Sequence, residues 1–570
     1  MKLDFTGGLY SSRSIAVDNQ ECLNWYPEVY GGGDNAKSSM VLMPTPGLSL
    51  FAESSLTGEV RALYVTGTGR MFAVIGSTLS EFSATGAETV CGTLLTSTGY
   101  VCMADNGEGS GRGVGLIIVD GQHGYFFNLS TNIFTKITDV SFPQCSTVAF
   151  LDGYFIVNEN GTGKVWCSNG YNGLDWGNND GSYNSTSTLD IKTGETKILI
   201  DTGLSIDVTG DTAVIAYSTT NYMNGEVLSY DSTTGYLTVY VKEIFGSGNW
   251  SSWAIDLYTG STKYATAESN TDPVVALKVV HNELWVFGTQ SLEVWYNAGA
   301  DNFPFVRTHG ASNNVGTVSS GSIATIGSTV FWLASNAQGH GTIYQTSDYS
   351  PNKVSPVGID CIIENMPNIS DATAYCYSQA GHSFYVISFP EGDRTLCYDL
   401  MTGLWHERAY YDAANGLFHR HKGQCGCFFN GMSLVGDNNS GLLYKFDLEN
   451  YTDNGDTIRR IRTGSHIFSN LERVFFTAFE LDFERGMGLN EGQGKEPFVF
   501  LQWSDNGGYT WSSEHWKTPG SMGKYKNRLR WNRLGYSRNR IFRIGVSDPV
   551  KNILIAAYAT VDGETNNVYQ

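Results

Sequence analysis

The feature that most constrains the fold of this chain is a short pair of β-rich runs that recurs along the sequence. Each copy joins two runs rich in Val, Ile, Phe and Tyr through Gly, Asn, Asp or Ser. Apolar and β-branched runs suit strands and small polar residues suit tight turns, so each copy predicts a β-hairpin. The copies lie at residues 62–75, 116–127, 147–157, 275–287, 323–333, 374–387 and 425–435.

A third β-rich run usually follows each hairpin, as at residues 292–296 and 442–446. A spacing of roughly 40–50 residues between such units is typical of the blades of a β-propeller. The sequence therefore predicts an all-β fold built on a β-propeller of six or seven blades. Two or three consecutive β-sandwiches remain the alternative.

Two interruptions divide the chain. The regular spacing breaks near residue 181, where Thr, Ser and Gly turns separate a different set of alternating runs, which predicts a small β-barrel or sandwich inserted through a surface loop. Beyond residues 450–457 the chain becomes rich in arginine. We expect an N-terminal arm with the first blades (1–180), the inserted module (181–262), the remaining blades (263–449) and a basic C-terminal β domain (450–570).

Charge and composition restrict the class of protein. Only 16% of the residues are charged and the formal net charge is -20, which argues against a general affinity for nucleic acids but allows a local basic patch. The N-terminus lacks the apolar stretch of a signal peptide, and no apolar run is long enough to span a membrane. The ten cysteines are scattered, as expected of thiols in a reducing cytoplasm.

One short motif is found in sialidases and related β proteins. Ser504, Asn506, Gly508, Thr510 and Trp511 resemble an Asp-box hairpin, with asparagine in the usual aspartate position. In such hairpins a polar side chain caps the turn and the tryptophan packs beneath it. A sialidase would also need an arginine cluster, a Tyr–Glu pair and an acidic aspartate, which we cannot assemble. We therefore predict a structural turn.

Other motifs also favour structure over chemistry. The turn from Asp399 to Trp405 resembles those of kelch-like blades, in which Asp and Thr fix the turn. His419 and His421 precede Cys425 and Cys427 at alternate strand positions, so zinc binding is geometrically possible, but buried cysteines in a strand are ordinary packing. Phosphate-binding loops, nucleophile elbows and His-Glu-x-x-His helices are absent. We predict no catalytic, cofactor-binding or metal site.

The most informative cluster is C-terminal. Nine lysines and arginines and no acidic residue lie between Trp516 and Ser547. Arg528, Arg530, Arg538 and Arg540 recur at alternate positions, so in extended strands they are expected to share one sheet face. Such a stripe suits an assembly interface or a DNA backbone, and a solvated face balanced by acidic neighbours is the third possibility. The predicted interface comprises Arg459, Arg460, Arg462, Lys524, Lys526, Arg528, Arg530, Trp531, Arg533, Arg538, Arg540, Phe542 and Arg543.

Several long motifs in order resemble one family. Residues 501–511, 524–535 and 546–551 resemble the C-terminal signature of the packaged-DNA stabilisation proteins, the tail hubs or nozzles of short-tailed bacteriophages. Residues 24–28 and 44–48 are similar to the opening motif of that family. Residues 176–178 and 265–269 look like two halves of one family segment, which the inserted module separates.

The resemblance implies a non-enzymatic tail protein. It implies a homo-oligomeric ring, expected to be hexameric, below the portal and its adaptor, with double-stranded DNA passing through its lumen. A tail needle, plug, tailspike or fibre protein is expected at its distal side, and no membrane is involved. The expected location is the virion tail, and the host cytoplasm during assembly. The alternative is a propeller that binds or cleaves carbohydrate during host attachment.

Overall fold

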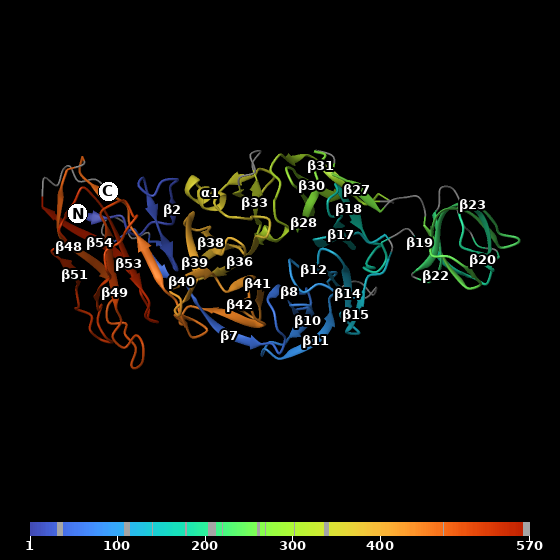
Figure 1. Cartoon of the computed structure of the whole chain (residues 1–570). Coiled ribbons are helices and arrows are strands. Elements are labelled where there is room, and N and C mark those ends of the chain that lie inside the picture. The colour runs from blue at the N-terminus through green and yellow to red at the C-terminus, as the bar shows by residue number, and fades with distance from the viewer. Residues whose placement is uncertain are drawn as a thin grey trace. The chain divides into compact units, whose positions relative to one another are not determined.

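The computed structural model describes residues 1–30, 38–107, 114–139, 141–176, 179–202, 204, 212–218, 220–258, 263–267, 270–300, 303–335, 341–470 and 472–562. The structure is 54% strand and 2% helix, which confirms the predicted all-β class. The chain divides into two compact units, residues 1–102, 287–292 and 312–570 and residues 103–286 and 293–311. The described residues form seven groups of four antiparallel strands, an additional sheet and a two-sheet sandwich. Figure 1 labels most of these strands.

Four of the four-stranded groups, or blades, belong to the first unit. Their central strands are buried, as in β9 (Met71–Ile75), and three of the four are meanders of consecutive strands. They are formed by β8 (Val60–Val65), β9, β10 (Thr78–Phe82) and β11 (Glu88–Thr93); by β32 (Ala324–Ile326), β33 (Thr329–Ser335), β34 (Gly341–Thr346) and β35 (Asn352–Lys353); by β36 (Thr373–Gln379), β37 (His382–Phe389), β38 (Arg394–Asp399) and β39 (Leu404–Asp412); and by β41 (Gly423–Phe429), β42 (Met432–Asp437), β43 (Leu442–Asp447) and β7 (Gly47–Glu53).

Close packing joins neighbouring blades of this unit. A Cβ atom added to Gly436 on β42 would lie 2.4 Å from Cγ1 of Val60 on β8, so glycine is required where these two blades meet. The α-helix that the described residues contain, α1 (Val357–Glu364), follows β35 and buries Ile359, Ile362 and Ile363 in the main hydrophobic core.

Strand β7 completes a blade whose other strands lie almost 400 residues later. It pairs antiparallel with β43, from Gly47 opposite Asp447 to Glu53 opposite Leu442. A parallel contact then links β7 to β44 (Thr452–Asp453), which forms a hairpin with β45 (Asp456–Thr457). This pairing fixes the early chain to the last blade.

The other three blades lie mainly in the second unit. They are formed by β12 (Cys102–Asp105), β13 (Gly115–Val119), β14 (Gly124–Asn128) and β15 (Ile133–Lys136); by β16 (Val148–Leu151), β17 (Tyr154–Asn158), β18 (Lys164–Cys167) and β27 (Tyr264–Thr266); and by β28 (Val274–Val280), β29 (Glu283–Gly288), β30 (Leu292–Asn297) and β31 (Phe305–Asn313). In the second blade, Lys164 pairs with Thr266, so its third and fourth strands are about 100 residues apart in the sequence.

The residues between β18 and β27 form a separate sheet with its own core. The strands are β19 (Asn179–Ser185), β21 (Gly194–Leu199), β22 (Thr212–Ser218), β23 (Asn221–Asp231), β24 (Tyr236–Phe245) and β26 (Trp253–Tyr258), with β20 (Leu189–Asp190) pairing β25 (Asn249–Trp250). Alternate residues such as Ile215, Val239 and Ile255 are fully buried within it. We refer to this sheet as the inserted module.

The C-terminal part is a sandwich of two sheets. The first contains β5 (Trp25–Val29), β6 (Met40–Pro44), β54 (Leu554–Asp562), β48 (Val474–Phe483) and β51 (Leu529–Asn532), with β1 (Lys2–Leu3) and β52 (Tyr536–Ser537) at its sides. The second contains β4 (Cys22–Leu23), β46 (Arg460–Thr463), β53 (Asn539–Val546), β49 (Val499–Ser504) and β50 (His515–Lys517), with β47 (Ile467–Phe468). Shorter pairs are β2 (Tyr10–Ser11) with β3 (Asn19–Gln20), and β40 (Leu417–Arg420) with β39.

The N-terminal arm therefore differs in position from our expectation. We had placed it with the first blades, but β1, β4, β5 and β6 are strands of the sandwich sheets. Phe5, Trp25 and Leu42 are buried in the core that the sandwich strands share, and Trp25 Nε1 donates to Asn552 Oδ1 at 2.9 Å. Burial of these large apolar side chains accounts for the position of the arm.

Candidate functional site

The basic residues of the C-terminal part lie on two different sheets. Arg530 lies in β51, which pairs with β48, whereas Arg540 lies in β53, which pairs with β46 and β49. The prediction that Arg528, Arg530, Arg538 and Arg540 share one sheet face is therefore wrong. The alternation of arginines is interrupted between Arg530 and Arg538. Arg533 and Gly535 adopt positive φ angles of 60° and 76°, and the chain then passes to the other sheet.

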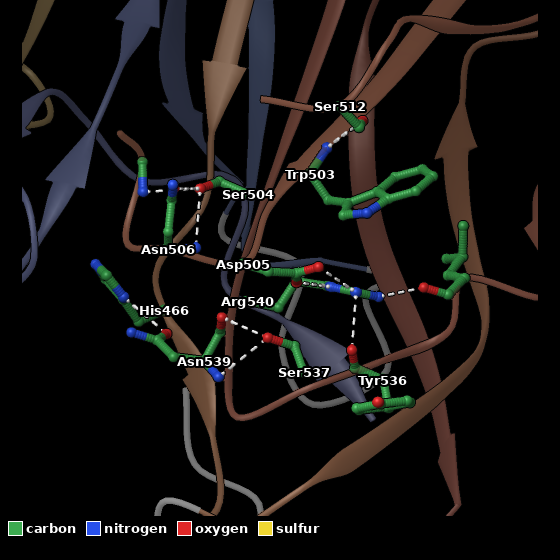
Figure 2. Close-up of polar contacts among 12 residues, drawn as sticks. His466, Trp503, Ser504, Asp505, Asn506, Ser512, Tyr536, Ser537, Asn539 and Arg540 are labelled. Carbon is green, nitrogen blue, oxygen red and sulfur yellow. Dashed lines mark hydrogen bonds and ion pairs between the residues drawn. The ribbon is translucent and has the colours of Figure 1, made fainter. Parts of the chain in front are cut away.

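Arg540 is an internal residue. Its side chain is 2% exposed, and it forms a two-pronged pair with Asp505, through Nε to Oδ1 at 2.7 Å and Nη2 to Oδ2 at 2.9 Å (Figure 2). Nη1 donates to the carbonyl of Leu534 at 2.6 Å, and the guanidinium lies 4.6 Å from the ring centre of Phe476. The guanidinium group of Arg540 therefore binds groups inside the sandwich and is not available to a partner protein.

Arg462 binds the N-terminal arm, and Arg460 donates to the carbonyl of Thr45 at 3.5 Å. Both are fully buried. Arg462 donates to the carbonyls of Phe5 at 3.0 Å and Gly8 at 2.9 Å. Burial lowers the pKa of Arg460 to about 10. Arg459 and Arg543 are half-buried and pair with Glu514 at 2.6 Å and Glu21 at 2.7 Å.

The predicted apolar anchors also belong to the core. Phe542 is 0% exposed and Trp531 is 5% exposed, and each packs against Phe479. Of the thirteen residues that we assigned to an interface, the structure places these two and five arginines inside or at the margin of the sandwich. Sequence spacing could not show this, because the acidic partners Glu21, Asp505 and Glu514 lie outside the basic run.

The remaining cations are exposed. Arg528 donates through Nε and Nη2 to both carboxylate oxygens of Glu480 at 2.8 Å, and Arg530 lies 3.7 Å from the same carboxylate. Hydrogen bonds from Arg528 lower the pKa of Glu480. Lys524, Lys526, Arg533 and Arg538 are exposed and form no ion pair with the residues that the structure describes.

An exposed group of aromatic and basic residues surrounds β52, and sequence reasoning missed most of it. Phe475 on β48 pairs with Tyr536 on β52, with ring centres 5.5 Å apart and exposed fractions of 51% and 50%. The guanidinium of Arg473 lies 4.8 Å from the Tyr536 ring centre. We call Arg473, Phe475, Arg533, Tyr536 and Arg538 the β52 patch. The sequence signal for this patch is the Val-Phe-Phe run at 474–476, because alternation in a strand turns its middle residue, Phe475, toward solvent.

Family models match nearly the whole chain. A model described as the β-propeller of bacteriophage P22 Gp10 matches residues 9–188 and 254–451. A second, described as the β-sandwich of the same protein, matches residues 459–562. The chain belongs to the bacteriophage P22 Gp10 family. It is therefore a phage structural protein that stabilises packaged DNA and a component of the virion tail, as the resemblance of its motifs predicted.

Other comparisons add little to this assignment. No curated protein sequence matches the chain. A crystal structure of the computationally designed Ika8 protein is 10% identical with a TM-score of 0.32, over 70% of this chain and 100% of that one. A structure of YCF48 bound to D1 peptide is 8% identical with a TM-score of 0.31, over 71% of this chain and 97% of that one. These similarities are too weak to carry an argument.

The Gp10-family propeller match omits residues 189–253, which lie within the inserted module. The module is therefore an addition to the part of the chain that resembles the family. No helix among the described residues is long and apolar enough to cross a membrane.

In this Gp10-family sandwich, the Asp-box-like residues form a hydrogen-bonded turn. Ser504 Oγ accepts from the backbone N–H of Gly508 at 2.9 Å, and Asn506 Oδ1 accepts from that of Thr510 at 3.0 Å. Asn506 Nδ2 also donates to Thr510 Oγ1 at 2.8 Å. Asparagine thus spans the turn with both ends of its amide, and Trp511 packs against Arg543, whose Cζ lies 3.7 Å from the ring centre.

The other motifs of the propeller are likewise used in packing. Thr402 Oγ1 and His382 Nδ1 lie 2.8 Å from Asp399 Oδ2, which fixes the Asp399–Trp405 turn. His421 is buried, and burial lowers its pKa to about 3. His419 Nδ1 instead lies 2.7 Å from Asp393. Among the described residues, no three His, Cys, Asp or Glu side chains are placed to hold a metal ion.

Proposed function

We propose that this Gp10-family protein forms a cyclic homo-oligomer, hexameric as the resemblance implies, below the portal and adaptor of a short-tailed phage. There it extends the DNA channel, helps to retain the packaged genome, and joins distal tail parts such as a needle, plug, tailspike or fibre. The observation that carries the proposal is the family match to both the propeller and the sandwich. We further propose that the protein has no enzymatic activity and assembles in the host cytoplasm.

The charge of the chain supports a passage for DNA. Only basic groups displace counterions from DNA and bind it, so a chain with a net charge of -20 offers a moving genome little adhesion. A propeller also has only short strand edges, which suits a rigid wall. Rings assemble when one surface patch meets a different patch on the next copy.

For the assembly contact we propose the exposed part of the basic cluster rather than the whole of it. The β52 patch combines three cations with two half-exposed aromatic rings, the residue types enriched in protein interfaces. Its arginines are free to pair with carboxylates of an acidic partner, including a second copy of this chain. Lys524, Lys526, Arg528 and Arg530 are proposed to extend this contact.

Reconstitution tests this function directly. The full chain is mixed with purified portal–adaptor complexes, and the products are followed by analytical ultracentrifugation and electron microscopy. We expect a ring of this protein on the adaptor, even if the chain alone is monomeric. A chain that stays monomeric in the presence of the complexes would exclude the hub function.

A further inference from the structure

One face of the inserted module exposes aromatic rings in a regular arrangement. On the β23–β24 ribbon, Tyr222 pairs with Phe245, Asn224 with Glu243 and Glu226 with Tyr240. Residues 222, 224 and 226 alternate with Met223, Gly225 and Val227, which are buried. The three pairs therefore lie on the outer side. We call Tyr222, Asn224, Glu226, Tyr240, Glu243 and Phe245 the β23–β24 face.

Two of the three aromatic residues of this face, Tyr222 and Phe245, are ordered by packing on each other. The rings of Tyr222 and Phe245 are stacked, with centres 4.3 Å apart and planes at 14°. Phe245 remains 42% exposed and Tyr240 48% exposed. Exposed aromatic rings that are prepositioned in this way mark a surface for a ligand or partner.

Polar groups lie between the two aromatic positions. Asn224 Nδ2 donates to Glu243 Oε2 at 3.4 Å, and the Glu243 carboxylate lies on the exposed side of the ribbon. Tyr222 and Glu226 are four residues apart, so the stacked pair and Tyr240 are separated by roughly 13 Å at about 3.3 Å per residue. The face thus offers two apolar platforms with donors and acceptors between them.

The charge of the module excludes anionic ligands. Residues 179–258 contain ten Asp and Glu and three Lys, a net charge of -7. The face carries two carboxylates, those of Glu226 and Glu243. One ammonium group, that of Lys242, lies 2.7 Å from Glu226 and neutralises only one of them. DNA, phospholipid headgroups and acidic polysaccharides would be repelled. Protein interfaces are enriched in aromatic residues and arginine and depleted in Glu. The β23–β24 face shares the aromatic residues but carries Glu226 and Glu243 and no arginine, so its polar residues fit a glycan better than a protein partner.

We propose that the β23–β24 face binds a neutral glycan chain. A pyranose ring presents C–H groups on one side, which stack on aromatic rings, and hydroxyl groups at its edge, which both donate and accept hydrogen bonds. Tyr222 with Phe245 and, separately, Tyr240 stack on two sugars of one chain, and the Glu243 carboxylate and the Asn224 amide nitrogen bind the hydroxyls between them. This function is independent of the assembly proposed above.

The test uses the full-length protein on a printed array of neutral and acidic bacterial polysaccharides. We expect binding to neutral chains, and a loss of at least tenfold in affinity for Tyr222→Ala and for Phe245→Ala. Phe245→Tyr retains the stack and should retain binding. Tyr217→Ala is the matched control, because Tyr217 stacks on Trp250 at 4.2 Å in the same module but lies outside the face.

Four results would overturn the proposal. Three of them are no binding to any neutral polysaccharide, binding to acidic polysaccharides alone, and neutral-chain binding that Tyr222→Ala and Phe245→Ala leave unchanged. A fourth is an equal loss in Tyr217→Ala, which would attribute the effect to general damage to the module. Failure here leaves the ring proposal intact, since assembly on the adaptor is measured separately with the same variants.

Discussion

At the scale of single residues, the C-terminal arginines differ mainly in burial. Arg540 is enclosed with its partner Asp505, whose side chain is 46% exposed, whereas Arg538 is exposed and unpaired among the described residues. Removing a buried arginine leaves its carbonyl partners without a donor, whereas a substitution at an exposed cation usually changes little. These residues are two positions apart in the sequence and therefore form a matched pair for mutation.

Arg540→Ala should destabilise the sandwich by about 2 kcal/mol, because it removes a buried guanidinium and leaves the carbonyls of Leu534 and Tyr536 without their donor. Arg538→Ala should change the unfolding free energy by less than about 0.5 kcal/mol. Both effects can be measured from urea unfolding midpoints, with tryptophan fluorescence as the signal. Similar midpoints for the two variants would contradict the buried position of Arg540.

Asp453 should make stability depend on pH. Burial raises the pKa of its carboxyl group to about 7, and Lys422 and Arg460 oppose that effect. Because the folded pKa lies above the unfolded value of about 3.9, the stabilising contribution is complete below that value and is lost as pH rises through 7. Asp453→Asn should therefore raise the thermal midpoint most at pH 8, and by a smaller amount at pH 5, where only part of the contribution has been lost.

The half-exposed neighbour Asp456 provides the control for this measurement, since Asp456→Asn removes a carboxyl group that also lies near Lys422. We expect its midpoint to fall slightly, through loss of the 2.6 Å ion pair, with no gain at pH 8. An increase for Asp453→Asn that is equal at both pH values would contradict the titration of a buried carboxyl group.

At the scale of elements, the inserted module joins the chain at two neighbouring points. Asn179 in β19 pairs with Tyr258 in β26, so the two ends of the module lie side by side. The adjacent blade is completed by β27, which comes after the module. Replacing residues 179–258 with a four-residue Gly-Ser linker should leave the blades folded, because the linker spans the roughly 5 Å between paired strands.

Circular dichroism and thermal unfolding of the shortened protein measure this outcome. Retention of a cooperative transition with a midpoint near that of the full chain is expected. Loss of soluble protein would show that the module supplies part of the propeller core. The domain limits that we inferred from sequence, 181–262 for the module, are tested by the same experiment.

The elements that sequence predicted are those with local pairing. Hairpins such as β16–β17 are marked by apolar runs around Asp152 and Gly153, and both turn residues adopt positive φ. The contact of β7 with β43 and the position of the N-terminal arm in the sandwich could not be predicted this way, because they pair residues about 400 and 500 positions apart. Likewise, the spacing of the arginines in the sequence could not predict in which sheet each arginine lies or how deeply it is buried.

At the scale of the whole molecule, the exposed cations could contact either DNA or a partner protein, whereas the buried cations stabilise the sandwich. Arginines that lined a DNA path would bind phosphates, with an affinity that falls steeply as salt rises, and would retard the genome. Arginines in a protein contact instead pair with carboxylates and set the register of the subunits. The β52 patch, with its exposed rings of Phe475 and Tyr536, fits the second role.

Charge reversal at the patch distinguishes these roles. The double variant Arg533→Glu, Arg538→Glu should abolish assembly onto portal–adaptor complexes. It should leave the free energy of unfolding within about 0.5 kcal/mol of the original value, because both side chains are exposed. Lys136→Glu, an exposed reversal on β15, should assemble normally. Sedimentation of the mixtures measures both. Variant particles that assemble normally but release DNA at a changed rate would place these arginines in the channel and contradict their assignment to a protein contact.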